Sequence, residues 1–305
     1  MTFSLNKADE AIIKGDFLVC PKTHKKIPLL EGKIIDLLPS SNEFYEGAYL
    51  NTVNFSGKKN QFLNWLYLWS INSGYLLKST THISKGSKVL ELGCGGGISY
   101  LGDQFSMYAC DFSLSSLKVA AKNYDYCIRT DATEFLPFTD NSMDAVISSY
   151  YWEHLTTSSK KNCLMEIKRI LKPGGLVIFL YDVETKNPFI EKFKAINEVA
   201  YNKYFLELDG HVGYETIQEN LELFNKAGFE ILENHSLQKT LIQETSVYIK
   251  LGYIDPKNIL VKFLSFLSSG ILLKPFIFLV RLFDSLFNFL PDSWGRIAIT
   301  TLKKA

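Results

Sequence analysis

The sequence carries almost no net charge and shows no excess of basic residues. Its 305 residues include 33 Lys and Arg against 32 Asp and Glu, which leaves a formal charge of +1 at pH 7. Proteins that bind nucleic acid through bulk electrostatics carry a clear basic surplus. The balance therefore argues against a nucleic-acid partner.

Cysteines are few and irregularly spaced. The chain has five, an odd number that lacks the close pairing of a secreted disulfide framework. The first residues also lack the uninterrupted apolar segment of a signal peptide. We therefore expect reduced thiols and a cytoplasmic location.

No stretch reaches the roughly 18 uncharged apolar residues that a membrane-spanning helix needs. Residues 259–290 come closest, and Pro275 is expected to split them into two short helices. Four charged residues interrupt the segment, namely Lys262, Lys274, Arg281 and Asp284. We expect a hydrophobic helical insertion over 249–292. Three roles stay open for it: packing on its own domain, a lid over an apolar substrate, or peripheral contact with the inner face of a membrane.

From residue 86 onward, apolar strands alternate with amphipathic helices. The strand candidates are Val89–Leu92, Ser106–Cys110, Tyr126–Arg129, Asp144–Ser149 and Gly175–Tyr181. Helices are expected between them over 114–123 and 160–171. Repeated strand–helix–strand units predict an α/β fold with a doubly wound, mostly parallel sheet. We place this core at 86–248.

Two segments precede the core. Residues 1–42 hold short extended pieces separated by Pro and Gly, which predicts a β-ribbon. Residues 43–85 are rich in aromatic side chains and predict a helical cap. One face of a helix there carries Phe62, Trp65, Leu66 and Trp69, and we expect it to pack on the larger core.

A glycine-rich turn follows the first core strand. Leu92 leads directly into Gly93-Cys94-Gly95-Gly96-Gly97. Glycines at such a turn let the backbone approach a ligand closely and leave helix N-terminal N–H groups aimed at it. The dinucleotide-binding fingerprint requires a glycine where this chain has Ile98. A nicotinamide-dependent oxidoreductase is therefore only an alternative.

Two carboxylates follow at the ends of the next strands. Asp111 lies eighteen positions after Gly93 and ends the second strand, and Asp131 follows the third. Ligands of open α/β sheets bind at the carboxyl ends of the strands. We expect both side chains to face the ligand held by the glycine turn.

A further motif opens the fifth strand, namely Lys172-Pro173-Gly174-Gly175. With these motifs in this order, residues 86–182 resemble the small-molecule branch of the class I S-adenosylmethionine-dependent methyltransferases. The resemblance implies a Rossmann-like sheet whose last strand, expected within 293–305, is antiparallel. It also implies S-adenosyl-L-methionine as the cofactor.

The resemblance further implies which residues would contact that cofactor. Glu91 and the loop would hold its methionine part, Asp111 its ribose and Asp131 its adenine. The full implied set is Glu91, Gly93, Cys94, Gly95, Gly97, Asp111, Phe112, Asp131, Ala132 and Ser148.

The acceptor is less constrained than the cofactor. The chain lacks the sequence signatures of nucleobase methyltransferases, so we expect a small organic or lipid-like acceptor and methylation on oxygen. His211 is the candidate base, because members of the resembled family often carry a histidine there. A module that binds the cofactor without catalysis is the alternative, and the oligomeric state stays open.

The N-terminal ribbon offers one pair of potential zinc ligands, Cys20 and His24. Structural zinc sites need four ligands. We therefore predict no metal.

Overall fold

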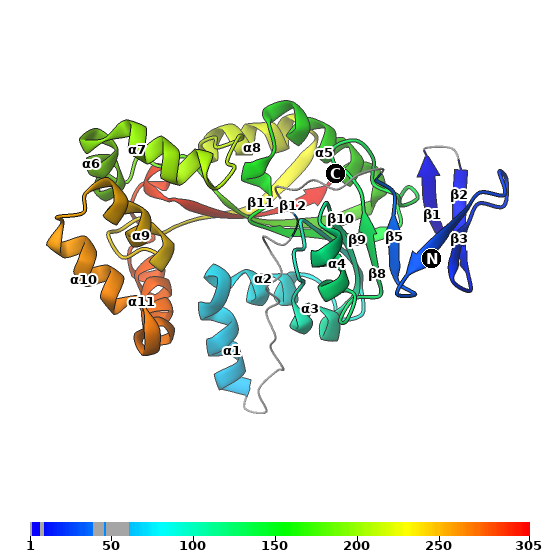
Figure 1. Cartoon of the computed structure of the whole chain (residues 1–305), viewed down its shortest axis with the longest axis horizontal. Helices are drawn as coiled ribbons and strands as arrows, with labels where there is room; N and C mark the ends of the chain where they lie inside the picture. The colour runs from blue at the N-terminus through cyan, green and yellow to red at the C-terminus, as the bar shows by residue number, and fades with distance from the viewer. Residues whose placement is uncertain (1, 7–8, 39–45, 47–60) are drawn as a thin grey trace.

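The computed structural model describes residues 2–6, 9–38, 46 and 61–305. The parts of the expected helical cap at 43–45 and 47–60 lie outside the described residues. Figure 1 shows one central sheet with helices on either side, a ribbon at one end and a helical layer at the other.

The core is a twelve-stranded sheet with the order β1-β2-β3-β4-β5-β8-β7-β6-β9-β10-β12-β11. Its central and distal strands are β5 (Ile34–Asp36), β6 (Lys88–Leu92), β7 (Ser106–Asp111), β8 (Tyr126–Arg129), β9 (Met143–Ser149), β10 (Leu171–Asp182), β11 (Phe229–Leu237) and β12 (Ile297–Lys304). Strands β5 to β10 pair in parallel, whereas β12 pairs antiparallel with both β10 and β11. The predicted doubly wound α/β fold with an antiparallel last strand is confirmed.

The predicted N-terminal ribbon belongs to this same sheet. It consists of β1 (Thr2–Asn6), β2 (Asp9–Lys14), β3 (Phe17–Val19) and β4 (Lys26–Leu30), in antiparallel pairs. Strand β4 pairs with β5, and β5 continues in parallel onto β8. Strand β5 therefore covers the edge that β8 would otherwise expose, and the ribbon extends the sheet beyond β5.

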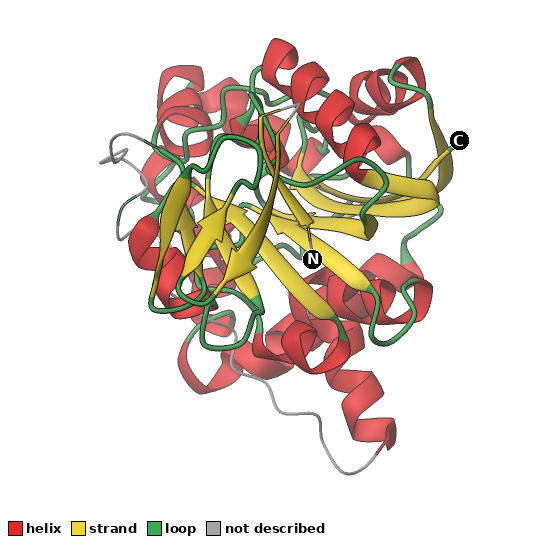
Figure 2. Cartoon of the chain, turned by 90° about the vertical axis from the view of Figure 1, so that its right-hand side faces the viewer, coloured by secondary structure: helices red, strands yellow, loops and turns green. Residues whose placement is uncertain are grey.

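Helices cover both faces of the sheet (Figure 2). Those nearest the core strands are α3 (Ser99–Gln104), α4 (Leu114–Ala120), α5 (Thr157–Ile170) and α8 (Ile217–Lys226). Successive strand residues point to opposite faces, so Val146 of β9 joins the hydrophobic cluster on one face and Ile147 the cluster on the other. Thr216 and Glu219 form a reciprocal capping box that fixes where α8 begins.

The hydrophobic C-terminal segment forms part of a helical layer. This layer holds α6 (Pro188–Ile196), α7 (Glu198–Asn202), α9 (Thr245–Ile254), α10 (Ile259–Leu267) and α11 (Leu273–Leu286). Phe193 and Phe205 from the segment after β10 share one cluster with Val247 and Val280 from the segment after β11. The helices that follow β11 thus pack against the helices that follow β10.

The break between α10 and α11 lies at residues 268–272, and not at Pro275 as the sequence suggested. Pro275 occupies the first turn of α11, where the missing N–H would have no helical partner. Within the described part of the chain, no single helix meets the length and apolarity of a bilayer span. The pair Ile259–Leu267 and Gly270–Leu286 meets them only together, with a 71° bend.

The cap contains α1 (Gln61–Ser70), a short turn over Ile71–Gly74, and α2 (Tyr75–His82). Helix α2 packs on the core through Tyr75 and Leu76, but the prediction that the aromatic stripe of α1 packs there is wrong. Phe62 and Trp65 remain 65% and 46% exposed, and Trp69 packs on Phe278 of α11, with ring centroids 5.4 Å apart.

Candidate functional site

A cavity of about 660 Å³ opens at the carboxyl ends of β6, β7, β8 and β9. Almost every residue expected to contact the cofactor lines it, namely Glu91, Gly93, Cys94, Gly95, Gly97, Asp111, Phe112, Asp131 and Ala132. The strand order places these chain segments side by side, so the site is a consequence of the topology.

The glycine loop needs its glycines for two reasons. Gly93, Gly95 and Gly97 have φ values of 62°, 51° and 73°, in the left-handed region that other residues avoid. A Cβ atom at Gly93 would also lie 2.6 Å from a ring carbon of Tyr151. The loop therefore tolerates no side chain where it passes beneath the Tyr151 ring.

Asp111 connects the loop to the next strand. Its two carboxylate oxygens accept hydrogen bonds from the backbone N–H groups of Gly95 and Ser113, both at 2.9 Å. Burial raises the pKa of Asp111, although the two hydrogen bonds act to lower it. Each carboxylate oxygen has a further lone pair that a ligand hydroxyl could use.

Glu91 lies beneath the loop and is fixed by Tyr124. The Tyr124 hydroxyl donates to Glu91 Oε2 at 2.5 Å and accepts from the N–H of Ile98 at 2.9 Å. Burial raises the pKa of Glu91 to about 8. Tyr124 thus connects Glu91, on the strand before the glycine loop, to Ile98, the residue after the loop.

Asp131 and Phe112 form the far rim of the cavity. Asp131 Oδ1 accepts from the N–H and the hydroxyl of Thr133, at 2.8 and 2.7 Å. Arg129 Nε donates to the Phe112 carbonyl at 3.0 Å. These contacts fix both segments in the absence of a ligand.

Ser148 is placed differently from the other expected residues. It is buried and donates to the Leu92 carbonyl at 2.8 Å, whereas its neighbour Ser149 lines the cavity. The alternation of side chains along β9 explains this one-residue difference.

Beyond β9 the cavity is lined by Tyr150, Tyr151, His154 and Leu155, none of which the sequence assigned to the site. Tyr150 has a φ of 54°, an uncommon conformation for a bulky residue that is found at functional sites. The position after the strand end was the only available signal. These side chains form the part of the cavity opposite the expected nucleoside end.

His211 lies behind His154, with ring centroids 5.2 Å apart, and does not itself line the cavity. Glu153 is the third member of the group. The potential ligand atoms of Glu153, His154 and His211 all lie within 4.8 Å of one another, so these residues could hold a metal ion.

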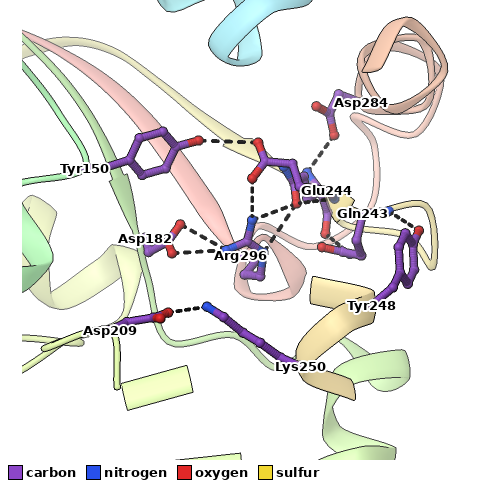
Figure 3. A network of polar contacts seen from close by, with 10 residues as sticks. Tyr150, Asp182, Asp209, Gln243, Glu244, Tyr248, Lys250, Asp284 and Arg296 are labelled. Atoms are coloured by element: carbon purple, nitrogen blue, oxygen red, sulfur yellow. Dashed lines mark hydrogen bonds and ion pairs between the residues drawn. The ribbon is translucent and has the colours of Figure 1, made fainter. Parts of the chain in front are cut away.

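A polar network ties this end of the sheet to the helical layer (Figure 3). Arg296 pairs with Asp182 and Glu244, and the Tyr150 hydroxyl donates to Glu244 at 3.3 Å. Lys250 of α9 forms an ion pair with Asp209, two residues before His211. The cavity residue Tyr150 is thereby connected to the helical layer.

The charge of the cavity indicates the ligand that it suits. Asp111 and Asp131 line it, and among the described lining residues there is no Lys or Arg. Glu91 also lines the cavity, but its raised pKa leaves it protonated and neutral near pH 7. Such a lining suits a cationic ligand with hydroxyls, such as S-adenosylmethionine with its sulfonium and ammonium groups. The loop has Ile98 where the dinucleotide-binding fingerprint has a glycine, which disfavours the oxidoreductase alternative.

Known proteins share this region of the chain. Residues 90–179 match the family described as "Methyltransferase domain". A demethylmenaquinone methyltransferase from Staphylococcus epidermidis is 29% identical over 171 residues, which is 52% of this chain and 68% of that protein. A second demethylmenaquinone methyltransferase, from Paenarthrobacter aurescens, is 34% identical over 41% of this chain and 47% of its own length.

A third relative is named as a tRNA methyltransferase. The tRNA (carboxymethyluridine(34)-5-O)-methyltransferase of Arabidopsis thaliana is 34% identical over 32% of this chain and 24% of its own length. The family match at residues 90–179 covers most of the residues that line the cavity. The chain therefore carries a methyltransferase domain of the class I, S-adenosylmethionine-dependent type.

Proposed function

We propose that this protein transfers the methyl group of S-adenosylmethionine to an oxygen of a small organic or lipid-like acceptor. The observation that carries the proposal is the cavity, in which a glycine loop and the carboxyl groups of Glu91, Asp111 and Asp131 face one space, without a cationic side chain among the described lining residues. The cofactor, when bound, supplies an electrophilic methyl group on a sulfonium sulfur.

The cofactor contacts follow from the placement of the lining residues. The loop from Gly93 to Gly97, with Glu91 beneath it, would hold the methionine part. Asp111 would accept from the ribose hydroxyls and Asp131 from the adenine amino group, with Phe112 and Ala132 beside the ring. Ser148 would act indirectly, by fixing the Leu92 carbonyl where the loop begins.

Methyl transfer to a hydroxyl needs a group that takes its proton. We assign this role to His211, which reaches the cavity through His154. Burial lowers the pKa of both imidazoles, so both are neutral near pH 7 and able to accept a proton. Tyr150, Tyr151 and Leu155 would position the acceptor.

A small acceptor is favoured over RNA by charge. The chain has a net charge of only +1, and Lys and Arg are absent from the described residues that line the cavity. One similar protein carries a tRNA activity in its name, so the assay must include tRNA as a competing acceptor.

We also infer that the helical layer rests on the inner surface of a membrane, from the cytoplasmic side. Large apolar residues on and beside α10 and α11 are strongly exposed, among them Ile259 at 83%, Phe263 at 55%, Phe266 at 67% and Ile271 at 94%. Lys262 and Lys274 are exposed on the same helices. Apolar side chains flanked by lysines are typical of helices that lie in an anionic lipid surface.

Calorimetric titration of the purified chain with S-adenosylhomocysteine tests the cofactor assignment. Release of that product from S-adenosylmethionine is then measured with hydroxylated amphiphiles, quinols and tRNA as acceptors. Binding together with turnover on a small acceptor supports the proposal. Binding without turnover on any acceptor would favour the inactive module, and turnover on tRNA alone would overturn the choice of acceptor.

A further inference from the structure

Glu153, His154 and His211 form a cluster whose polar atoms are incompletely satisfied. Glu153 is 1% exposed, and its Oε2 has no hydrogen-bond partner within the described structure. The same holds for Nδ1 of His211, which is also buried. A buried polar atom without a partner destabilises the folded chain, because it has lost its hydrogen bonds to water. Two such atoms in one cluster point to a ligand between them.

The backbone holds the cluster in place before any ligand binds. The N–H of Gly213 donates to the Glu153 carbonyl at 2.9 Å, which fixes the loop that carries His211. Lys160, itself fully buried, donates to the Gly213 carbonyl at 2.7 Å. Any side chain at Gly213 would meet the Leu155 carbonyl oxygen. The loop is therefore fixed against the turn that bears the other two residues.

His154 has the hydrogen-bond pattern common among metal-binding histidines. Its Nδ1 lies 3.1 Å from the Gly210 carbonyl oxygen. A carbonyl can only accept, so Nδ1 carries the hydrogen and the neutral ring has its lone pair on Nε2. Metal-binding histidines usually donate their other ring N–H to a carbonyl or carboxylate in this way.

We propose that Glu153, His154 and His211 bind one divalent transition-metal ion, with Zn²⁺ or Mn²⁺ as suitable ions. Two imidazoles and one carboxylate suit such ions and leave coordination positions open. Bonds of about 2.0–2.2 Å place ligand atoms about 3–4 Å apart. The present separations of up to 4.8 Å therefore require side-chain shifts of about an ångström.

The role of the ion rests on the proposed function. His154 lines the cavity, so an open position on the ion would face the acceptor. A hydroxyl bound there would release its proton to water more readily, and the oxygen would attack the methyl group with the freed electron pair. With the ion bound, His211 would serve as a ligand, so the role of base that the proposed function gives to His211 applies to the chain without the ion.

The test is metal binding by the full chain, without cofactor. Protein stripped with a chelator is titrated with Zn²⁺ by calorimetry, and visible spectra are recorded after addition of Co²⁺. We expect one ion per chain and cobalt absorption bands. The substitutions His211→Ala and Glu153→Gln should each weaken Zn²⁺ binding by at least about tenfold.

His235→Ala is the matched control, because His235 pairs with Glu233 at 2.9 Å on β11 and belongs to a different cluster. It should bind Zn²⁺ as the parent chain does. Circular dichroism and S-adenosylhomocysteine binding of each variant verify folding. A folded parent chain that binds no ion, or an unchanged affinity in both cluster variants, overturns the metal site. Loss of S-adenosylhomocysteine binding by the parent chain would instead overturn the proposed function.

Discussion

Arg296 donates from Nη1 to both carboxylate oxygens of Asp182, at 3.0 and 3.1 Å. Its Nη2 donates to Glu244 at 3.1 Å. Asp182 ends β10, Arg296 precedes β12, and Glu244 precedes α9. One guanidinium, only 4% exposed, therefore joins two neighbouring strands and the helical layer.

Arg296→Gln should destabilise the fold strongly, because it leaves buried carboxylates without their cation. Removal of one partner of a buried pair costs about 3–5 kcal/mol. Urea unfolding followed by circular dichroism measures the change. Lys172→Gln, which breaks an exposed pair with Asp144, is the control and should cost less than about 1 kcal/mol. Equal losses in the two variants would contradict the role given to Arg296.

Asp111→Asn should weaken binding of S-adenosylhomocysteine by about tenfold or more, because hydrogen bonds to a charged group contribute about 1.5–3 kcal/mol. Calorimetry measures the affinity. Asp111 also holds Gly95 and Ser113, so a melting curve of the variant must accompany the titration. Asp103→Asn, at an exposed position on α3, should bind as the parent does. An undiminished affinity in Asp111→Asn would remove this carboxylate from the site.

Glu91 should make stability depend on pH. Burial raises its pKa from 4.5 to about 8, so between these values the folded state keeps a proton that the unfolded state has released. The contribution is fully present below pH 4.5 and is lost as the pH rises through 8, at about 1.4 kcal/mol per pH unit.

Glu91→Gln removes this titration while keeping an acceptor for Tyr124. Unfolding free energies at pH 5, 6, 7 and 8 should therefore fall more steeply with pH in the parent chain than in the variant. Parallel curves would show that Glu91 is already ionised in the folded protein.

Membrane contact should depend on the exposed face of α10. Phe263→Glu combined with Phe266→Glu should reduce sedimentation with vesicles of phosphatidylcholine and phosphatidylglycerol by at least about tenfold, since burying each phenylalanine contributes about 1.5–3 kcal/mol. Met165→Glu is the control. Met165 is also exposed, but it lies on α5, which is well separated from α10 and α11 in Figure 1. Equal sedimentation of the parent and both variants would exclude this surface.

The parts of the site that the sequence predicted are those built from local patterns. A strand that runs into Gly93 and a strand that ends at Asp111 are visible in short stretches of chain, and the topology rules bring them together. The resemblance implies Ser148, but the alternation of side chains at the end of β9 places Ser149 in the cavity and Ser148 against the Leu92 carbonyl.

Other features depend on long-range packing and left no local signal. Trp69 packs on Phe278, more than two hundred residues away, so its partner could not be found from periodicity. His211 meets Glu153 and His154 only because the loop before α8 folds back over the end of β9. A histidine in a loop gives no indication of such neighbours.

The pairing of β10 with β12 also constrains how the protein is made. Leu176 pairs with Lys303, and Phe229 of β11 pairs with Lys304. On a ribosome, β10 and β11 would both emerge well before the strand that fits between them. Their open edges need shielding for the several seconds that translation of the intervening segment takes, at about 5–20 residues per second. Nascent chains of this protein should therefore depend on chaperones until β12 is synthesised.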